Sequence, residues 1–215
     1  MVLKLLEMRI AWYFLIILIP PLIILGNFQY LVLNLGFYQN LYAKHGIYQS
    51  FGSREVVDQA TVNLFGYFRD KNELDHNFFS TQATLHLADV KNLLEVESGL
   101  FYLSLATVVV ISSIFVVNKQ HKKLASSFLI SSVITIIIVI LLGLGLLSVF
   151  DPLFIGFHKL LFNNQLWLFP ASDNLIRLFP QQFFVSFANN LATNILIISA
   201  VIALLSLFIS RKTAK

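Results

Sequence analysis

The 215-residue chain contains no cysteine and few charged residues. Without cysteine it has no disulfide, no thiol nucleophile, no thiolate metal ligand and no site for palmitoylation. Charged residues make up 12% of the chain and hydrophobic residues 57%, whereas a soluble domain of this size carries about 25% charged residues. This composition excludes an ordinary soluble protein and indicates a membrane protein.

Charge is missing above all from four long stretches of the chain. No Asp, Glu, Lys or Arg occurs in residues 10–43, 98–118, 124–150 or 178–210. A helix needs about 20 mainly apolar residues to cross the ~30 Å core of a bilayer. We therefore predict a single membrane domain over residues 1–215, with spans at about 10–33, 100–117, 124–147 and 191–210.

Basic residues lie on one side of these predicted spans. The two ends and the 118–123 link hold eight basic residues and one acid, whereas the 44–97 segment holds five basic residues and eight acids. By the positive-inside rule we expect both termini in the cytoplasm and two segments, 36–97 and 150–188, on the outer side of the membrane. The net charge of +4 is then a signal of topology, so no nucleic-acid partner is expected.

Both outer segments carry signals for short helices. Apolar residues at helical spacing predict a helix over 54–68, and Ser80 is suited to cap a second helix over about 81–95. In the later segment, Asp151-Pro152 predicts the start of a helix that ends near Phe162. This helix is apolar almost all round and too short to span, so it must lie in the membrane interface or re-enter the membrane.

Three further signals complete the predicted fold. Ser172 or Asp173 is suited to cap a short helix through Arg177, and Pro180 to start a helix that continues into the last span. Aromatic residues crowd into 37–79, which predicts a layer at the lipid headgroups. The fold class is therefore an all-α membrane protein, with four transmembrane helices and an extracytoplasmic cap of short interfacial helices.

Two of the five histidines are candidates for chemistry. His86 and His158 each lie on a predicted short outer helix among apolar residues. Asp89 follows His86 by three positions on the same helical face, where a carboxylate can hold one imidazole nitrogen and leave the other to act as a base. On spacing alone, a pair of interfacial histidines with satisfied hydrogen bonds is the favoured interpretation, and no spacing shows that His158 approaches His86.

Other chemistries find less support in the sequence. A metal site built from the two histidines and Asp89 is disfavoured, because the chain has neither cysteine nor a His-x-Glu or Glu-x-x-His helix motif. Gly-x-Ser-x-Gly and phosphate-binding glycine loops are also absent. Since the spans contain no charged residue, a pump or transporter is not indicated. No metal or cofactor is expected.

Several of these residues resemble the bacterial lipoprotein intramolecular transacylases. The resemblance rests on Phe79-Ser80, the run His86-Leu87-Ala88-Asp89-Val90-Lys91, Asp151-Pro152, Phe157-His158 and Pro180-Gln181-Gln182-Phe183-Phe184. It covers nearly the whole chain, with four spans and two outer segments in the same order. The combination of the His-x-x-Asp-Val-Lys helix with the later Phe-His is its most specific part.

The resemblance implies an acyltransferase that acts on diacylglyceryl lipoproteins within the membrane lipids. Such an enzyme moves the sn-2 acyl chain to the α-amino group of the N-terminal cysteine and gives the lyso form, without acyl-CoA or a second phospholipid. His86 and His158 would be its acid and base, Asp89 would orient His86, and Lys91 or a backbone N–H would stabilise the oxyanion. Which histidine is the base, and whether an acyl-enzyme forms, stays open.

A different class of function is the alternative. The chain would then be a non-enzymatic membrane sensor or assembly subunit that presents its aromatic cap to a partner protein. Conversion of a diacylated lipopeptide by the purified protein alone distinguishes the two hypotheses.

Overall fold

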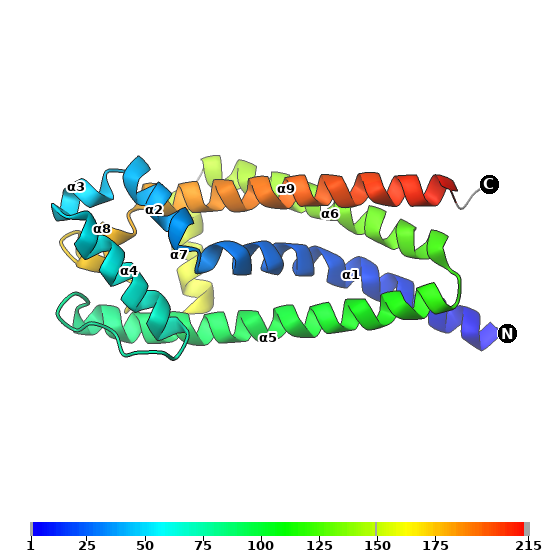
Figure 1. The fold of residues 1–215 in the computed structure, drawn as a ribbon, viewed down its shortest axis with the longest axis horizontal. Helices are drawn as coiled ribbons and strands as arrows, with labels where there is room; N and C mark the ends of the chain where they lie inside the picture. The colour runs from blue at the N-terminus through cyan, green and yellow to red at the C-terminus, as the bar shows by residue number, and fades with distance from the viewer. Residues whose placement is uncertain (1, 149, 213–215) are drawn as a thin grey trace. The chain divides into compact units, whose positions relative to one another are not determined.

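The computed structural model describes residues 2–148 and 150–212, and these residues form only helices and their connections. Their order along the chain (Figure 1) is α1 (Val2–Val32), α2 (Leu35–Lys44), α3 (Ile47–Phe51), α4 (Arg54–Phe68), α5 (Thr81–Val117), α6 (His121–Ser148), α7 (Phe150–Leu161), α8 (Asn174–Leu178) and α9 (Gln181–Lys212). The predicted all-α class is confirmed.

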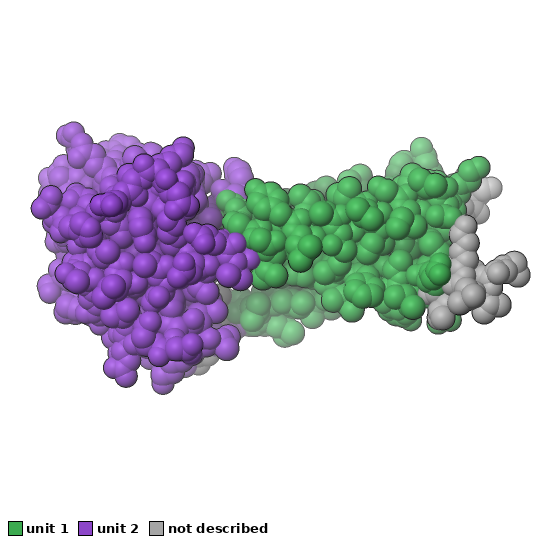
Figure 2. Space-filling model, turned by 90° about the horizontal axis from the view of Figure 1, so that it is seen from below, with its two compact units in different colours: residues 1–29, 97–144, 191–215 green, residues 30–96, 145–190 purple. Residues whose placement is uncertain are grey.

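Four of these helices are long and apolar enough to cross a membrane. The helical stretches that contain such a span are Glu7–Val32, Thr81–Val117, His121–Gly145 and Gln181–Lys212. The chain also divides into two compact units, coloured separately in Figure 2. Unit 1 comprises residues 1–29, 97–144 and 191–215, and unit 2 comprises residues 30–96 and 145–190.

Unit 1 is built from the apolar parts of α1, α5, α6 and α9. Its core contains Leu15, Ile19, Phe115 and Ile195, each at most 3% exposed. Much of the remaining surface consists of large exposed apolar side chains, such as Leu141 and Leu204. A helix that is apolar all round is expected where lipid rather than water surrounds it.

The break predicted between residues 95 and 100 is wrong, because α5 runs uninterrupted from Thr81 to Val117. No proline lies in this stretch, and a single Gly99 does not end a helix. At 1.5 Å per residue the helix is about 55 Å long, nearly twice the ~30 Å bilayer core. The charge-free part, 98–117, is therefore the spanning part, and the charged part, 81–97, lies outside the core.

Unit 2 contains most of the short helices. The predicted helix over 54–68 is confirmed as α4, and its N-cap Ser53 accepts a hydrogen bond from the Val56 N–H. The predicted helix ending near Phe162 is confirmed as α7, and Asp173 caps α8 as predicted. The chain also folds into α2 and α3, two helices that the sequence did not predict.

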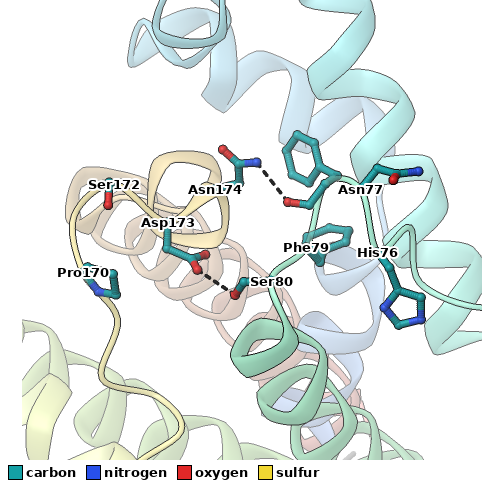
Figure 3. A pocket seen from close by; sticks show the side chains of 9 residues that line it. His76, Asn77, Phe79, Ser80, Pro170, Ser172, Asp173 and Asn174 are labelled. Atoms are coloured by element: carbon teal, nitrogen blue, oxygen red, sulfur yellow. Dashed lines mark hydrogen bonds between the residues drawn. The ribbon is translucent and has the colours of Figure 1, made fainter.

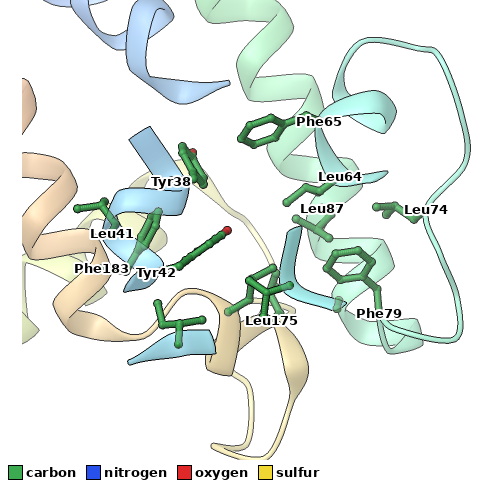
Figure 4. Packing of buried hydrophobic residues seen from close by; sticks show 14 residues of the cluster. Tyr38, Leu41, Tyr42, Leu64, Phe65, Leu74, Phe79, Leu87, Leu175 and Phe183 are labelled. Atoms are coloured by element: carbon green, nitrogen blue, oxygen red, sulfur yellow. The ribbon is translucent and has the colours of Figure 1, made fainter. Parts of the chain in front are cut away.

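The core of unit 2 is largely aromatic (Figure 4). Tyr38 packs edge-on against Phe65, with ring centroids 4.9 Å apart, and lies 5.1 Å from Phe183. Tyr42 is fully buried, and its hydroxyl shares a 2.9 Å hydrogen bond with Thr61. Many of the aromatic residues of 37–79 therefore pack against one another, and their position at the headgroups stays a prediction. They give the short helices a shared core that a single helix of this length lacks.

Candidate active site

His86 lies in the second turn of α5, and the N-cap of that helix fixes its position. The Ser80 hydroxyl accepts a hydrogen bond from the Ala83 N–H at 3.1 Å, which fixes the first turn. The His86 side chain is 7% exposed and contacts the rings of Phe162 and Phe169, at centroid distances of 4.9 and 5.6 Å. His86 therefore sits in an aromatic pocket within unit 2.

His158 lies near the end of α7, where its imidazole has a defined proton position. Its Nδ1 is 2.8 Å from the Phe154 carbonyl oxygen, one turn earlier. A carbonyl can only accept, so Nδ1 carries the hydrogen and Nε2 keeps its lone pair in the neutral ring. The rings of Phe154 and Trp167 pack on the imidazole, with centroids 4.2 and 5.0 Å away.

The structure brings the two histidines together although 72 positions separate them in the sequence. Their ring centroids are 6.3 Å apart and the ring planes are inclined by 29°. Phe162 packs against both rings. The two predicted outer helices thus supply one pair of imidazoles, close enough to act on a single group lying between them.

Burial keeps both imidazoles neutral near pH 7. It lowers the pKa of His86 to about 4, with a further lowering by the charge of His158 and a smaller opposing effect of Asp89. Burial also lowers the pKa of His158, and the Phe154 carbonyl opposes this. Because a proton on His158 disfavours a proton on His86, the pair takes up a second proton less readily than the first.

Asp89 does not hydrogen-bond to His86. The buried Nδ1 of His86 has no hydrogen-bond partner among the described residues. The Asp89 carboxylate instead accepts a 2.9 Å hydrogen bond from the Asn164 side chain. The direct His86–Asp89 contact that the spacing suggested is therefore absent from the described structure, and Asp89 reaches the site through Asn164 and through its charge.

Lys91 points away from the histidine pair. Its ammonium forms an ion pair with Asp70, and it lies 4.7 Å from the centroid of the Tyr67 ring. The hydrogen bond to Asp70 raises the pKa of Lys91. A five-residue offset on α5 turns Lys91 about 140° from His86, so the structure does not bring these two side chains together.

The connection after α7 supplies residues that the sequence did not single out. Asn164 accepts hydrogen bonds from the Leu166 N–H through its side chain and from Trp167 Nε1 through its backbone carbonyl, at 3.0 and 2.9 Å. Gln82 of α5 donates to the carbonyls of Leu166 and Leu168. These contacts hold the loop that places Trp167 on His158 and Phe169 on His86. The one available signal was the Asn163-Asn164 helix stop, which does not show the long-range partners.

The other histidines and possible metal ligands lie elsewhere. His45 shares a 2.8 Å hydrogen bond with Ser186, His76 is exposed, and His121 begins α6. Among residues 2–148 and 150–212, no group of three or more His, Cys, Asp or Glu side chains is arranged to hold a metal ion.

Comparison with known proteins gives a consistent result. Residues 13–184 match the family model described as lipoprotein intramolecular transacylase Lit. The crystal structure of Lit from Bacillus cereus superposes with a TM-score of 0.87 at 23% identity, covering 97% of this chain and 98% of that one. Two further structures of the same protein, with a histidine replaced by arginine or by alanine, each give a TM-score of 0.83 at 23% identity over 99% of this chain and 96% or 97% of theirs.

No curated protein matches the chain. At 23% identity the solved structures establish the membrane fold, whereas the family model covers well over half of the sequence. The chain therefore belongs to the lipoprotein intramolecular transacylase Lit family.

Proposed function

We propose that this chain moves the sn-2 acyl chain of an S-diacylglyceryl lipoprotein to the α-amino group of the same lipoprotein's N-terminal cysteine. The product is the N-acyl, S-monoacylglyceryl lyso form. The observation that carries the proposal is the pair of neutral imidazoles, His86 and His158, whose rings lie 6.3 Å apart in an aromatic pocket. The family name, which specifies an acyl transfer within a lipoprotein, supports it.

The reaction needs two proton transfers at one centre. The cysteine nitrogen attacks the ester carbonyl, the C–N bond forms, and the amine loses a proton. The bond from the carbonyl carbon to the glycerol oxygen then breaks, and that oxygen gains a proton. The net change is an isomerisation, so no external acyl donor or cofactor takes part.

His158 is suited to take the amine proton. Its Nδ1–H is fixed on the Phe154 carbonyl, which leaves Nε2 as the acceptor. Both rings start neutral near pH 7, so His86 receives the proton that His158 takes from the amine and passes it to the leaving glycerol oxygen. The low pKa of His86 makes this transient imidazolium a strong acid. One proton shared by the pair meets both needs, and each positioned group contributes about 10²–10⁴ in rate.

The roles of the other two predicted residues are different from those of the histidines. Asp89 acts at a distance, through its charge on His86 and through Asn164, which holds the loop behind both rings. A role of Lys91 as an oxyanion donor stays a prediction and requires its ammonium to leave Asp70. A backbone N–H is the alternative donor.

The active site faces the outer side of the bacterial plasma membrane in this proposal, and both termini face the cytoplasm. The charge asymmetry between the 44–97 segment and the ends supports that orientation. Because the chain has no cysteine, single cysteines at Lys71 and Lys119 report on it directly. A membrane-impermeant thiol reagent added to intact cells should label position 71 alone, and labelling at position 119 instead would reverse the orientation.

Mass spectrometry of a lipoprotein N-terminus tests the proposed reaction. A diacylated lipopeptide incubated with the purified protein should keep its intact mass, while its fragments show one acyl chain moved from glycerol to nitrogen. A product lighter by one acyl chain would indicate a hydrolase. An unchanged substrate would favour the non-enzymatic sensor or assembly subunit.

A further inference from the structure

A polar hollow lies in unit 2 where two connecting loops meet. It has a volume of about 390 Å³ and is lined by residues 76–80, which lead into α5, and by Pro170, Ser172, Asp173 and Asn174, which lead into α8 (Figure 3). Two hydrogen bonds join the loops. The Ser80 hydroxyl donates to Asp173 at 2.7 Å, and the Asn174 side chain donates to the Phe78 carbonyl at 2.9 Å. The hollow is therefore a braced feature of the fold.

The lining offers neutral hydrogen-bonding groups. The side chains of His76, Asn77 and Ser172 are exposed and have no hydrogen-bond partner within the described part of the chain. Asp173 is the charged residue of this lining, and each of its carboxylate oxygens already accepts one hydrogen bond, from the Ser80 hydroxyl and the Leu175 N–H. Neutral donors and acceptors of this kind match peptide groups better than a phosphate or an ammonium ion.

The hollow begins beside the histidine pair. Phe169 packs on His86, and the next residue, Pro170, lines the hollow. The Cα atoms of Phe169 and Pro170 are about 3.8 Å apart, as in any trans peptide. On α5, Ser80 precedes His86 by six residues, which is about 9 Å of helix rise. The charge-free spanning part of α5 starts at Ser98, which follows His86 along the helix, whereas Ser80 precedes it.

Resting on the function proposed above, we propose that this hollow binds the main chain of the first few residues that follow the lipidated cysteine. With the cysteine at the histidines, the acyl chains extend into lipid and the polypeptide must leave toward water. About three extended residues cover the ~9 Å of helix rise between His86 and Ser80. Main-chain binding would let one enzyme accept lipoproteins whose sequences differ after the cysteine.

Two non-reacting analogues test this proposal. The first is S-dipalmitoylglyceryl cysteine amide with an acetylated α-amino group, and the second carries about five further residues. Acetylation removes the nucleophile, so both analogues report binding to the full-length protein without turnover. We expect the longer analogue to bind about tenfold more tightly, as two hydrogen bonds to main-chain groups provide.

Variants of the lining locate the effect. The double variant Asn77→Ala/Ser172→Ala should bring the two dissociation constants to within about twofold of each other, and Ser172→Trp, which fills the hollow, should do the same. Asn92→Ala, an exposed asparagine on α5 outside the hollow, is the matched control and should keep the tenfold ratio. Equal binding of both analogues by the unaltered protein, or an unchanged ratio in the double variant, would overturn the proposal.

Turnover of the unacetylated lipopeptide, measured in parallel, separates the two claims. Length-dependent binding without turnover would remove the proposed function and retain the peptide-binding site. Turnover together with equal binding of the short and long analogues would retain the proposed function and remove the peptide-binding site.

Discussion

The buried hydroxyls of helix α6 in unit 1 and the loop side chains of unit 2 find their hydrogen-bond partners in different ways. In unit 1, buried hydroxyls on α6 mostly turn back onto their own helix, as Ser131 does to Ser127 and Thr135 does to Ser131. In unit 2, polar side chains join segments far apart in sequence, as in Asn164 to Asp89 and Ser80 to Asp173. The first pattern satisfies single helices in lipid, and the second fixes a particular arrangement of loops.

The same contrast extends to the titratable groups. The spanning parts of unit 1 carry no charged residue, whereas both histidines with lowered pKa and aromatic neighbours lie in unit 2. The comparison indicates that unit 1 provides the membrane anchor and unit 2 the chemistry. It predicts that substitutions in unit 2 act on turnover and those in unit 1 on stability.

The largest expected effect is the loss of either histidine of the pair. His86→Ala and His158→Ala should each lower lyso-form production by about 10²–10⁴, because each removes a proton-transfer group. The double variant should lose no more than the worse single variant, since the two groups act as a unit. Turnover by purified variants, with their melting temperatures, provides the measurement.

His121→Ala is the matched control for the histidine variants. His121 begins α6 in unit 1, and its replacement should leave turnover unchanged. If this variant lost as much activity as His86→Ala, or if the double variant kept normal activity, the assignment of chemistry to unit 2 would be wrong.

A smaller effect is expected from the contacts behind the rings. Asn164→Ala removes the link to Asp89 and loosens the loop that carries Trp167, and a displacement of this kind should lower turnover by up to about 10². Asp89→Asn should lower it less, because an amide oxygen still accepts from Asn164. Initial rates would rank the variants, with the exposed neighbour Asn163→Ala as control. A larger loss in Asp89→Asn than in Asn164→Ala would favour direct action of the carboxylate on His86.

The lowered pKa values predict a pH profile. Because the pKa values of both histidines are lowered from 6.5, both rings stay neutral down to about that pH. Their protonation should therefore reduce kcat/KM only below about pH 6.5. Above that pH, the substrate amine, with an ordinary pKa of about 7.7–8.0, should set the dependence alone. In a plot of log kcat/KM against pH, the slope on the acid side should therefore increase only below pH 6.5. Steepening near pH 7.5 would mean that the imidazoles are not held in their neutral form.

The smallest effect is expected in unit 1. Ser131→Ala removes a hydrogen bond to Ser127 and a 3.3 Å contact with the Ile16 carbonyl. Hydrogen bonds within a membrane average about 0.6 kcal/mol, so thermal unfolding in detergent should shift slightly and turnover should not change. The exposed Ser113→Ala, whose hydroxyl also bonds to its own helix, is the control. Loss of turnover in Ser131→Ala would contradict the prediction that substitutions in unit 1 act on stability alone.

Much of the fold could be predicted from the sequence, because lipid and helix ends impose simple local rules. Charge-free stretches located the four long helices, and apolar spacing located α4. Asp173 marked the start of α8, and Asp151-Pro152, which lies in the first turn of α7, marked the start of that helix to within two residues. The helices α2 and α3 escaped prediction because they continue a charge-free run. Their limits depend on Asn34, whose side chain caps α2, and on Gly46 and Gly52, which adopt positive φ values of 68° and 69°.

The candidate site could be predicted only in part. The two histidines stood out by residue type and by their predicted helices, but no local rule gives the partners that hold them. Asn164 meets Asp89 across 75 positions, and Gln82 meets Leu168 across 86. The spacing of His86 and Asp89 suggested a direct contact, whereas the fold supplies Asn164 as a competing partner for the carboxylate.

The most direct test of the account is a crossover experiment with the purified protein. Two lipopeptides are mixed, one with heavy-isotope acyl chains and one with light chains, each on a different peptide. Transfer within one substrate predicts that each peptide's new amide carries only its own acyl chain, and that the His86→Ala/His158→Ala variant forms none. Mixed products would contradict intramolecular transfer, and amide formed by the double variant would contradict the role of the two histidines.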